Sequence, residues 1–329
     1  MSHPSLTVGV GAALVDLLIE EEDEFLSGMG AEKGGMTLVD AEAIQQAMKR
    51  STSLTKTVPG GSACNTLVGI GNLGGKARMI GRVGKDDLAG HFREGLRRAG
   101  VEERLRVSED VSTGQVLSVV TPDAQRTMFT FLGASLGLNP ADIEEADFQD
   151  AAQVHLEGYL LFNRPVVDKV LDLARRHKVK VALDLGSFQV VEACRGLIDE
   201  LFERRLVDIV IANEDEAAAY TGLSDTDALE VFARKADIAV VKLGSEGVLV
   251  ARGKERLDIE AHLAEAVDTT GAGDLWAGGF LYGLNHGLSL ENSANLGCKV
   301  GAEVVQVMGA VIPTDGWGRV HAYRKGLNG

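Results

Sequence analysis

The chain has 329 residues, a formal net charge of −15 and 45% hydrophobic residues. No basic patch offsets this acidity, which argues against nucleic acid or an anionic membrane surface as a partner. No apolar run is long enough to span a membrane, and no basic region precedes the first apolar segment, so we expect no signal peptide. The three cysteines lie far apart without metal-binding spacing. This favours a reducing compartment, and we expect a cytoplasmic protein.

The first part of the chain predicts strands from β-branched segments and helices from apolar side chains at three- and four-residue steps. The expected strands cover residues 6–10, 14–20, 54–58, 79–83, 115–121 and 127–132, and the expected helices cover 37–50, 62–73 and 87–99. We expect Thr37 to cap the first helix, with Asp40 three residues later. The last two strands flank Pro-Asp-Ala-Gln and predict a hairpin. With the strands at 14–20 and 54–58, this hairpin would form a small separate sheet.

After residue 150, strands and helices alternate along the chain. The expected strands cover 154–157, 179–183, 208–211 and 238–243, and the expected helices cover 164–177, 189–204 and 214–220. Such alternation predicts an α/β fold with a mostly parallel central sheet and helices on both faces, which is a three-layer α/β/α arrangement. Ligands of such sheets bind beyond the carboxyl ends of the strands.

The segment Asp268-Thr-Thr-Gly-Ala-Gly-Asp274 precedes a helical pattern that Asn285 and Gly287 are expected to end. Free N–H groups and the helix dipole make such an N-terminus a site for anions. Asp274 beside it is a candidate general base, although the helix N-terminus should favour its ionised form. Gly271, Ala272 and Gly273 could donate N–H groups to a transferring phosphoryl group. Taken alone, the segment fits a glycine-rich turn with an acidic first helical turn equally well.

A second motif, Gly60-Gly-Ser-Ala-Cys-Asn65, lies about two hundred residues earlier. In this order the two motifs resemble the paired signatures of the ribokinase-like (PfkB) carbohydrate kinase family. Within that family, the segments PGGSACNT and RTMFTFLGAS look like those of bacterial adenosine kinases. The resemblance implies an enzyme, a phosphotransferase with an alcohol acceptor, that uses ATP and Mg²⁺ and in some members a monovalent cation such as K⁺. By resemblance, Asp274 is its base and Gly271–Gly273 its anion hole.

The resemblance also implies a domain division. Residues 1–13, 60–112 and 133–329 would form the nucleotide-binding α/β core. Residues 14–59 and 113–132, including the helix at 37–50, would form a small β lid over the substrate. A monomer or a homodimer joined through the lid is expected.

Further segments match the nucleotide side of the family's site. Asn213-Glu-Asp-Glu216 resembles an Asn-x-x-Glu motif that places magnesium and phosphate, with Glu216 acting on Mg²⁺ through water, although the same spacing predicts a capping box. Lys242-Leu-Gly-Ser-Glu-Gly247 resembles the nucleotide loop, although an ordinary hairpin turn fits it too. Lys242 stands where many members have threonine, so its role is open. The remaining residues assigned to the nucleotide are Gly244, Gly247, Thr269 and Asn295.

The substrate side would be formed by Asp16, Gly60, Gly61 and Asn65, since a carboxylate and an amide can each take two hydroxyls of a vicinal diol. A solvated loop acid and a polar helix residue are the alternatives for Asp16 and Asn65. Arg126 is the cation expected near the substrate. Asp184, at the end of VALDLG, is a weaker candidate near the phosphates or the substrate.

Substrate identity depends on the lid. Its segment MFTFL, which contains Met128, Phe129, Phe131 and Leu132, offers apolar surface suited to a flat base. This favours a nucleoside, with adenosine and its 5′-hydroxyl first, over ribose, fructose or 2-keto-3-deoxygluconate. A keto-deoxy acid would call for more than one lid cation. A non-catalytic ligand-binding member of the family is a further alternative. A dinucleotide oxidoreductase is disfavoured because VGVGAAL lacks GxGxxG.

Overall fold

The computed structural model describes residues 5–27, 29, 33–53, 56–123 and 125–327, and two β-sheets organise them. The strands of the larger sheet are β1 (Leu6–Val10), β5 (Ala77–Val83), β6 (Val101–Val107), β9 (Ala151–Glu157), β10 (Lys180–Asp184), β11 (Ile209–Asn213), β12 (Ile238–Lys242), β13 (Val248–Arg252) and β14 (Glu255–Ile259). Their spatial order is β14-β13-β12-β11-β10-β9-β1-β5-β6. Every pair from β6 to β12 is parallel, and β13 and β14 extend one edge as an antiparallel hairpin.

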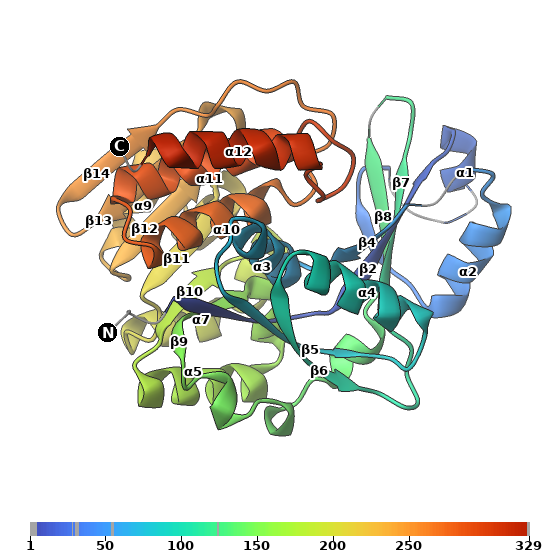
Figure 1. Cartoon of the computed structure of the whole chain (residues 1–329), viewed down its shortest axis with the longest axis horizontal. Helices are drawn as coiled ribbons and strands as arrows, with labels where there is room; N and C mark the ends of the chain where they lie inside the picture. The colour runs from blue at the N-terminus through green and yellow to red at the C-terminus, as the bar shows by residue number, and fades with distance from the viewer. Residues whose placement is uncertain (1–4, 28, 30–32, 54–55, 124, 328–329) are drawn as a thin grey trace.

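Helices cover both faces of this sheet (Figure 1). One face carries α3 (Ser62–Asn72), α4 (Asp87–Arg98), α10 (Ala272–Asn285), α11 (Leu290–Val304) and α12 (Thr314–Gly326). The other carries α5 (Arg164–His177), α6 (Phe188–Ala193), α7 (Arg195–Glu203), α8 (Glu214–Thr221) and α9 (Asp225–Ala233). Alternate strand residues serve the two cores: Val210 packs with the second group and Ile211 with the first. The predicted three-layer α/β/α fold with a mostly parallel sheet is confirmed.

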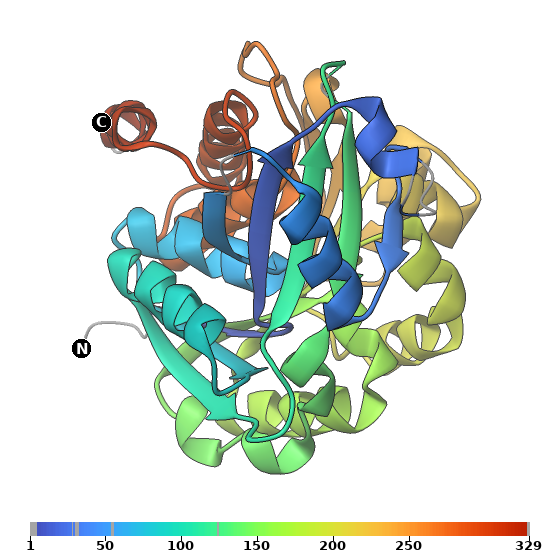
Figure 2. The same cartoon turned by 90° about the vertical axis from the view of Figure 1, so that its right-hand side faces the viewer.

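The smaller sheet lies beside the core and has the strand order β3-β8-β7-β2-β4. Its strands are β2 (Leu14–Glu20), β3 (Met36–Leu38), β4 (Lys56–Gly60), β7 (Gly114–Val120) and β8 (Arg126–Phe131), and its helices are α1 (Asp23–Ser27) and α2 (Ala41–Arg50). Figure 2 shows α2 across one face of this sheet. Phe129 and Leu117 are fully buried in one cluster with Ile44 of α2. The register places Asp16, Val116 and Thr130 in one row on the opposite face.

Short 3₁₀ segments complete the chain between these elements. They are η1 (Gly133–Gly137), η2 (Pro140–Asp142), η3 (Glu145–Asp147), η4 (Gly158–Phe162) and η5 (Gly244–Glu246). Within the described residues, no helix is both long and apolar enough to cross a membrane.

The expected helix at 37–50 is wrong at its start. Residues 36–38 form β3, which pairs in parallel with β8, and the helix begins only at Ala41. Asp40, not Thr37, is the N-cap: its Oδ1 accepts a hydrogen bond from Ala43 N at 2.8 Å. An Asp oxygen satisfies a free N–H of the first turn as well as a threonine hydroxyl does, so spacing alone did not fix which residue caps the helix.

Other boundaries differ because tertiary packing decides them. The expected helix at 189–204 is two helices, α6 and α7, separated at Cys194. β6, α9 and β14 carried no clear periodic signal and were not predicted. For the strand predicted at 54–58, residues 54 and 55 lie outside the described residues, and the remainder belongs to β4. The hairpin and the separate small sheet are present as predicted.

A buried carboxyl group joins the core to the start of the small sheet. Glu157, at the carboxyl end of β9, accepts hydrogen bonds from Ala12 N at 2.8 Å and from Ala63 N at 2.9 Å. Ala12 lies between β1 and β2, and Ala63 lies in the first turn of α3. A Cβ atom at Gly11 would lie 2.4 Å from the Glu157 carboxyl carbon, so only glycine fits there. Burial raises the pKa of Glu157 to about 7, although its two backbone hydrogen bonds act in the opposite direction.

This raised pKa predicts a pH-dependent loss of stability. In the unfolded chain Glu157 releases its proton near its ordinary pKa, whereas the folded protein holds it until about pH 7. The stabilisation from the protonated group is therefore complete below about pH 4 and is lost as the pH rises through 7, by up to about 3 kcal/mol. In Glu157→Gln the side chain does not titrate. The unfolding free energy of wild type minus that of Glu157→Gln should therefore fall as the pH rises from 5 to 8, by up to about 3 kcal/mol, measured by urea denaturation.

The matched control is Glu265→Gln, which changes an exposed glutamate. Its unfolding free energy should differ from that of wild type by a constant amount over the same pH range. A pH-independent difference for Glu157→Gln would contradict the assignment of a raised pKa to this carboxyl group.

Candidate active site

The candidate site lies at the carboxyl edge of the parallel sheet. Glu157, Asp184, Asn213 and Lys242 are the last residues of β9, β10, β11 and β12. These strands are neighbours, so their ends meet along one edge. The polar residues predicted from the sequence therefore gather where ligands of such sheets bind.

Asp274 joins the two sequence motifs directly. Its Oδ1 accepts a hydrogen bond from Ser62 Oγ at 2.7 Å, and its Oδ2 accepts one from Asn65 Nδ2 at 3.0 Å. Its backbone oxygen accepts a third from Thr66 Oγ1 at 3.0 Å. These contacts fix the Asp274 carboxylate in the first turn of α10, against the first turn of α3.

The protonation of Asp274 differs from the sequence expectation. Burial raises the pKa of Asp274 above its ordinary value, and the charge of Asp184 adds to this. The hydrogen bonds from Asn65 and Ser62 and the charge of Lys242 act in the opposite direction but do not outweigh burial. The expectation that the helix N-terminus would favour the ionised form of Asp274 is therefore wrong, because burial has the larger effect. A raised pKa brings a carboxylate closer to what a general base requires.

The residues predicted to form an anion hole lie at the start of α10. Gly271 is the N-cap of α10 with φ 69°, and a Cβ atom there would lie 2.5 Å from Ala310 Cβ, so glycine is required. Ala272 N donates to Thr269 O at 3.1 Å, which engages one of the three predicted donors. Within the described part of the chain, the N–H groups of Gly271 and Gly273 form no such bond. These two remain able to bind an anion.

The predicted substrate residues Asp16, Gly60 and Gly61 pack tightly together. A Cβ atom at Gly60 would lie 2.3 Å from Asp16 Oδ1, and one at Gly61, where φ is 96°, would lie 2.3 Å from Ala12 O. Asp16 is buried, and its burial raises its pKa to about 7, with Arg126 opposing and Asp274 reinforcing the shift. Asp16 is therefore not a solvated loop acid. It lies close enough to Asp274 for the two charges to interact.

Arg126 lies between the small sheet and the core. Its Nη1 is 3.9 Å from Asp268 Oδ1, and among the described residues this buried nitrogen has no hydrogen-bond partner. Asp268 itself accepts bonds from Thr270 N at 2.9 Å and from Gly309 N at 2.8 Å. Arg126 can thus donate to a ligand without first losing a partner.

Asn213 and Glu216 form the capping box that the spacing allowed. Glu216 N donates to Asn213 Oδ1 at 2.8 Å, and Asn213 N donates to Glu216 Oε2 at 2.9 Å. Burial raises the pKa of Glu216 to about 7, reinforced by the charge of Asp184 and opposed by that of Lys242. The capping box uses only one of the two carboxylate oxygens of Glu216.

At this edge of the sheet, a magnesium ion would need ligands from nucleotide phosphates and water in addition to protein carboxylates. The described residues contain no group of three side chains that could hold a metal ion. Mg²⁺ commonly keeps several waters and binds through one or two carboxylates and substrate phosphates. Glu216 suits that mode, because its second carboxylate oxygen takes no part in the capping box.

Lys242 contacts Asp184. Its Nζ lies 3.0 Å from Asp184 Oδ2, and both side chains are largely buried. In the loop that follows, Gly244 has φ 56° and Gly247 has φ 114°, and a Cβ atom at Gly247 would lie 2.0 Å from Ile259 O. The packing of β13 against β14 therefore already requires Gly247, with or without a nucleotide.

Two of the predicted nucleotide residues are not linked to the cluster around Asp274 by a side-chain contact. Asn295 Nδ2 donates to Glu291 O in its own helix at 3.0 Å. Thr269 is exposed, and its backbone oxygen accepts the bond from Ala272 N.

The sequence did not single out several residues at this edge. Glu157 and Ser62 supply contacts described above, and a polar residue at a strand end or in the glycine motif was the available signal. Tyr159 and Phe188 follow β9 and β10 and are 45% and 43% exposed, which is high for large aromatic residues. Burial of its hydroxyl raises the pKa of Tyr159, and the charges of Asp274 and Glu216 contribute, which places this ring near the cluster.

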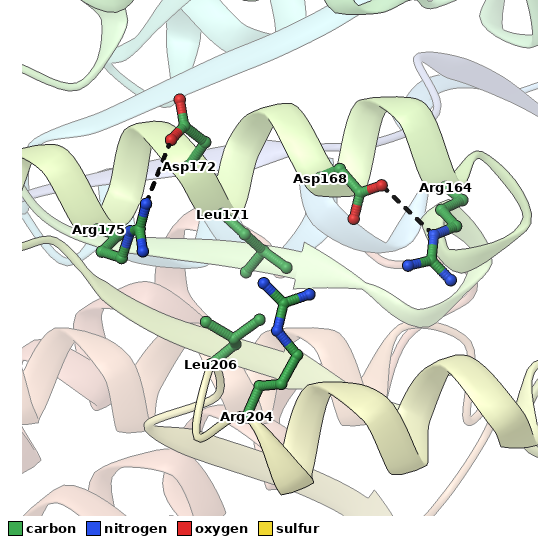
Figure 3. Close-up of a pocket in the computed structure, with 7 residues that line it drawn as sticks. All are labelled: Arg164, Asp168, Leu171, Asp172, Arg175, Arg204 and Leu206. Carbon is green, nitrogen blue, oxygen red and sulfur yellow. Dashed lines mark hydrogen bonds and ion pairs between the residues drawn. The ribbon is translucent and has the colours of Figure 1, made fainter.

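Two surface cavities lie elsewhere on the described part of the chain. One of about 240 Å³ is lined by residues of α5 and by Arg204 and Leu206 (Figure 3). The arginines there pair with nearby carboxylates: Arg164 with Asp168 at 3.4 Å and Arg175 with Asp172 at 3.9 Å. A second cavity of about 640 Å³ is lined by the amino ends of β10 and β12 and by Asn285 at the end of α10, away from the carboxyl edge. Neither contains a residue of the candidate site.

Comparison with known proteins agrees with this geometry. The profile of the pfkB family carbohydrate kinases matches residues 13–316. Adenosine kinase of Saccharomyces cerevisiae is 27% identical, over 94% of this chain and 97% of its own length. Ribokinase of Haemophilus influenzae is 29% identical, over 78% of this chain and 84% of its own.

Solved structures are similar over nearly the whole chain. A probable sugar kinase from Rhizobium etli has 34% identity and a TM-score of 0.90, with 99% of this chain and 100% of that chain covered. Adenosine kinase from Sinorhizobium meliloti has 34% identity and a TM-score of 0.89, with coverage of 98% and 99%. With the two motifs joined at Asp274, these matches show that the chain belongs to the pfkB family of carbohydrate kinases, sugar and nucleoside kinases that transfer a phosphoryl group to a hydroxyl.

Proposed function

We propose that this kinase phosphorylates a nucleoside, with adenosine as the first candidate, by transferring the γ-phosphoryl group of ATP to the 5′-hydroxyl. The observation that carries the kinase chemistry is the carboxylate of Asp274, held by Ser62 and Asn65 beside the free N–H groups of Gly271 and Gly273. Full-length similarity to two adenosine kinases supports the choice of acceptor.

In the proposed reaction, Asp274 accepts the proton of the acceptor hydroxyl as its oxygen bonds to the γ-phosphorus. The bond from that phosphorus to the β-phosphate oxygen breaks, and ADP leaves. Gly271 and Gly273 donate N–H groups to the phosphoryl oxygens, a contribution that often dominates in such sites. Mg²⁺, held by the phosphates and through water by Glu216, would neutralise phosphate charge. Asp16 and Asn65 orient the substrate hydroxyls, and Gly60 and Gly61 let them approach the backbone.

We also propose that residues 14–59 and 113–132 act as a lid on a core of residues 1–13, 60–112 and 133–329. The face opposite α2 carries Asp16, Val116 and Thr130, and Arg126 lies on the same face of β8 as Thr130. Phe129 is not available to a substrate, because it is fully buried with Ile44 on the other face. The aromatic surface expected from the lid segment MFTFL is therefore smaller than the sequence indicated.

Support for a flat acceptor comes instead from Tyr159 and Phe188. Both residues are exposed and follow adjacent parallel strands, and a flat base can pack against an exposed aromatic ring of this kind. On the lid, Arg126 is one cation beside the Asp268 carboxylate. An acidic sugar would gain little from this arrangement, since its carboxylate would compete with Asp268 for a single guanidinium.

Replacement of the base tests the kinase chemistry. In Asp274→Asn the amide retains hydrogen-bonding atoms at the same place but cannot accept the hydroxyl proton. We expect kcat with ATP and adenosine to fall by about 10²–10⁴, the range for loss of general base catalysis, with the melting temperature nearly unchanged. The control is Asp110→Asn, an exposed acid. Asp274→Asn with near-normal turnover would refute the assigned base.

Replacement of the aromatic residues tests the acceptor. If the base packs on Tyr159 and Phe188, Tyr159→Ala and Phe188→Ala should each raise KM for adenosine by about tenfold, since an aromatic contact of this kind is worth roughly 1–1.5 kcal/mol. KM for ATP should stay within about twofold of wild type. Turnover should be compared across adenosine, other nucleosides, ribose, fructose and keto-deoxy sugars. Turnover with only non-nucleosides would exclude the nucleoside assignment while leaving the kinase chemistry intact.

A further inference from the structure

We propose that Lys242 is a catalytic residue that contacts the transferring phosphoryl group, and that Asp184 is the positioning residue that holds it there. This inference rests on the proposed phosphoryl transfer and assigns roles to two residues that the sequence left open.

The first observation is convergence across the sheet edge. Lys242 ends β12 and Asp184 ends β10, with β11 between them. The two side chains nevertheless meet over the end of β11, with Nζ 3.0 Å from Asp184 Oδ2. Their side chains are only 14% and 6% exposed. Lys242 is therefore held in one place, unlike a surface lysine with a freely moving amine.

The second observation is where that amine points. A Cβ atom at Gly273 would lie 3.0 Å from Lys242 Nζ. Gly273 is in the first turn of α10, and its own N–H group has no hydrogen-bond partner among the described residues. The ammonium group therefore lies beside the N–H groups proposed to bind the phosphoryl oxygens.

The ammonium group and the first turn of α10 both attract anions. A helix N-terminus carries partial positive charge, so a cation beside it is repelled, whereas an anion is attracted. The Nζ atom of Lys242 lies next to Gly273 in that turn, and Asp184 partly compensates its charge. An anion at the start of α10 can therefore contact both the ammonium group and the helix N-terminus, as a γ-phosphoryl group in transfer would.

Lys242 is charged, and not all of its N–H donors are used by Asp184. Burial alone would lower the pKa of Lys242, but the nearby charges of Asp184 and Glu216 outweigh burial and raise it. An ammonium group has three N–H donors. Its hydrogen bond within the described residues is the one to Asp184. It can thus keep Asp184 and still donate to a phosphoryl oxygen.

The competing explanation is that Lys242 and Asp184 form an ion pair with a structural role only. The two can be separated by mutation, because a buried ion pair can often be replaced by neutral residues without loss of stability. The test uses Lys242→Met, Lys242→Arg and the double variant Lys242→Met/Asp184→Asn. The double variant has no unpaired buried carboxylate, so it can be measured even if Lys242→Met alone folds poorly. Lys254→Met, in the exposed turn between β13 and β14, is the control. The measurements are kcat, KM for the acceptor, melting temperature, and Kd of ATP and of ADP by calorimetry with Mg²⁺.

We expect kcat of Lys242→Met and of the double variant to fall by about 10²–10³, as for removal of one donor to a developing oxyanion. KM for the acceptor should stay within about threefold. Kd should rise about tenfold more for ATP than for ADP, because the lost charge-assisted bond goes to the γ-phosphoryl group. Lys242→Arg should recover part of kcat, and Lys254→Met should match wild type.

Three outcomes separate the possibilities. If folded Lys242→Met and the folded double variant keep kcat within about threefold of an active wild type, the inference is wrong. If Kd rises equally for ATP and ADP, Lys242 does not contact the γ-phosphoryl group. If wild type turns over no acceptor, the proposed function fails, and the difference between ATP and ADP binding still decides the role of Lys242.

Discussion

Burial of several carboxyl groups at one edge of the parallel sheet is the constraint on which the rest of the site depends. Asp16, Glu157, Glu216 and Asp274 all lie there, and burial raises the pKa of each. Their negative charges also repel one another, which reinforces the shifts. Such a cluster is stable only if fixed donors and cations offset it. The offsetting groups come from different parts of the chain, and this brings together α3, α10, the strand ends and the small sheet.

The donors that offset this charge also set the geometry. Glu157 is satisfied by Ala12 N and Ala63 N, which fixes the connection to the small sheet relative to α3. The same turn of α3 carries Ser62 and Asn65, which hold Asp274. One buried carboxyl group therefore helps to position the proposed base through the helix between them. The close fit of Gly11 against Glu157 and of Gly60 against Asp16 follows from the same crowding.

The sequence was sufficient to predict the layers of the fold, and two of its motifs meet in the structure. Alternating β-branched strands and amphipathic helices predicted the parallel sheet, because both periodicities arise from which face is buried. The two motifs predicted Asp274 and Asn65 together, and the structure joins them at 3.0 Å. What the sequence could not provide was the state of these groups. The pKa of Asp274 depends on desolvation by distant segments, so a local rule about helix N-termini gave the wrong direction.

The sequence also did not predict which face of the small sheet each side chain occupies, and this affects which substrate can bind. Adjacent residues of a strand point to opposite faces, so a one-residue uncertainty in register exchanges the residues available to a ligand for those packed in a core. The segment MFTFL looked uniformly apolar, yet Phe129 packs on α2 while Arg126 and Thr130 lie on the other face. This face of the small sheet therefore offers one cation, Arg126, together with apolar side chains such as Met128 and Leu18, and no aromatic ring of β8. For the proposed nucleoside acceptor, recognition of the base would then rest largely on the core, at Tyr159 and Phe188, which follow β9 and β10. The proposed lid would order the hydroxyls and exclude water, and the core would select the acceptor.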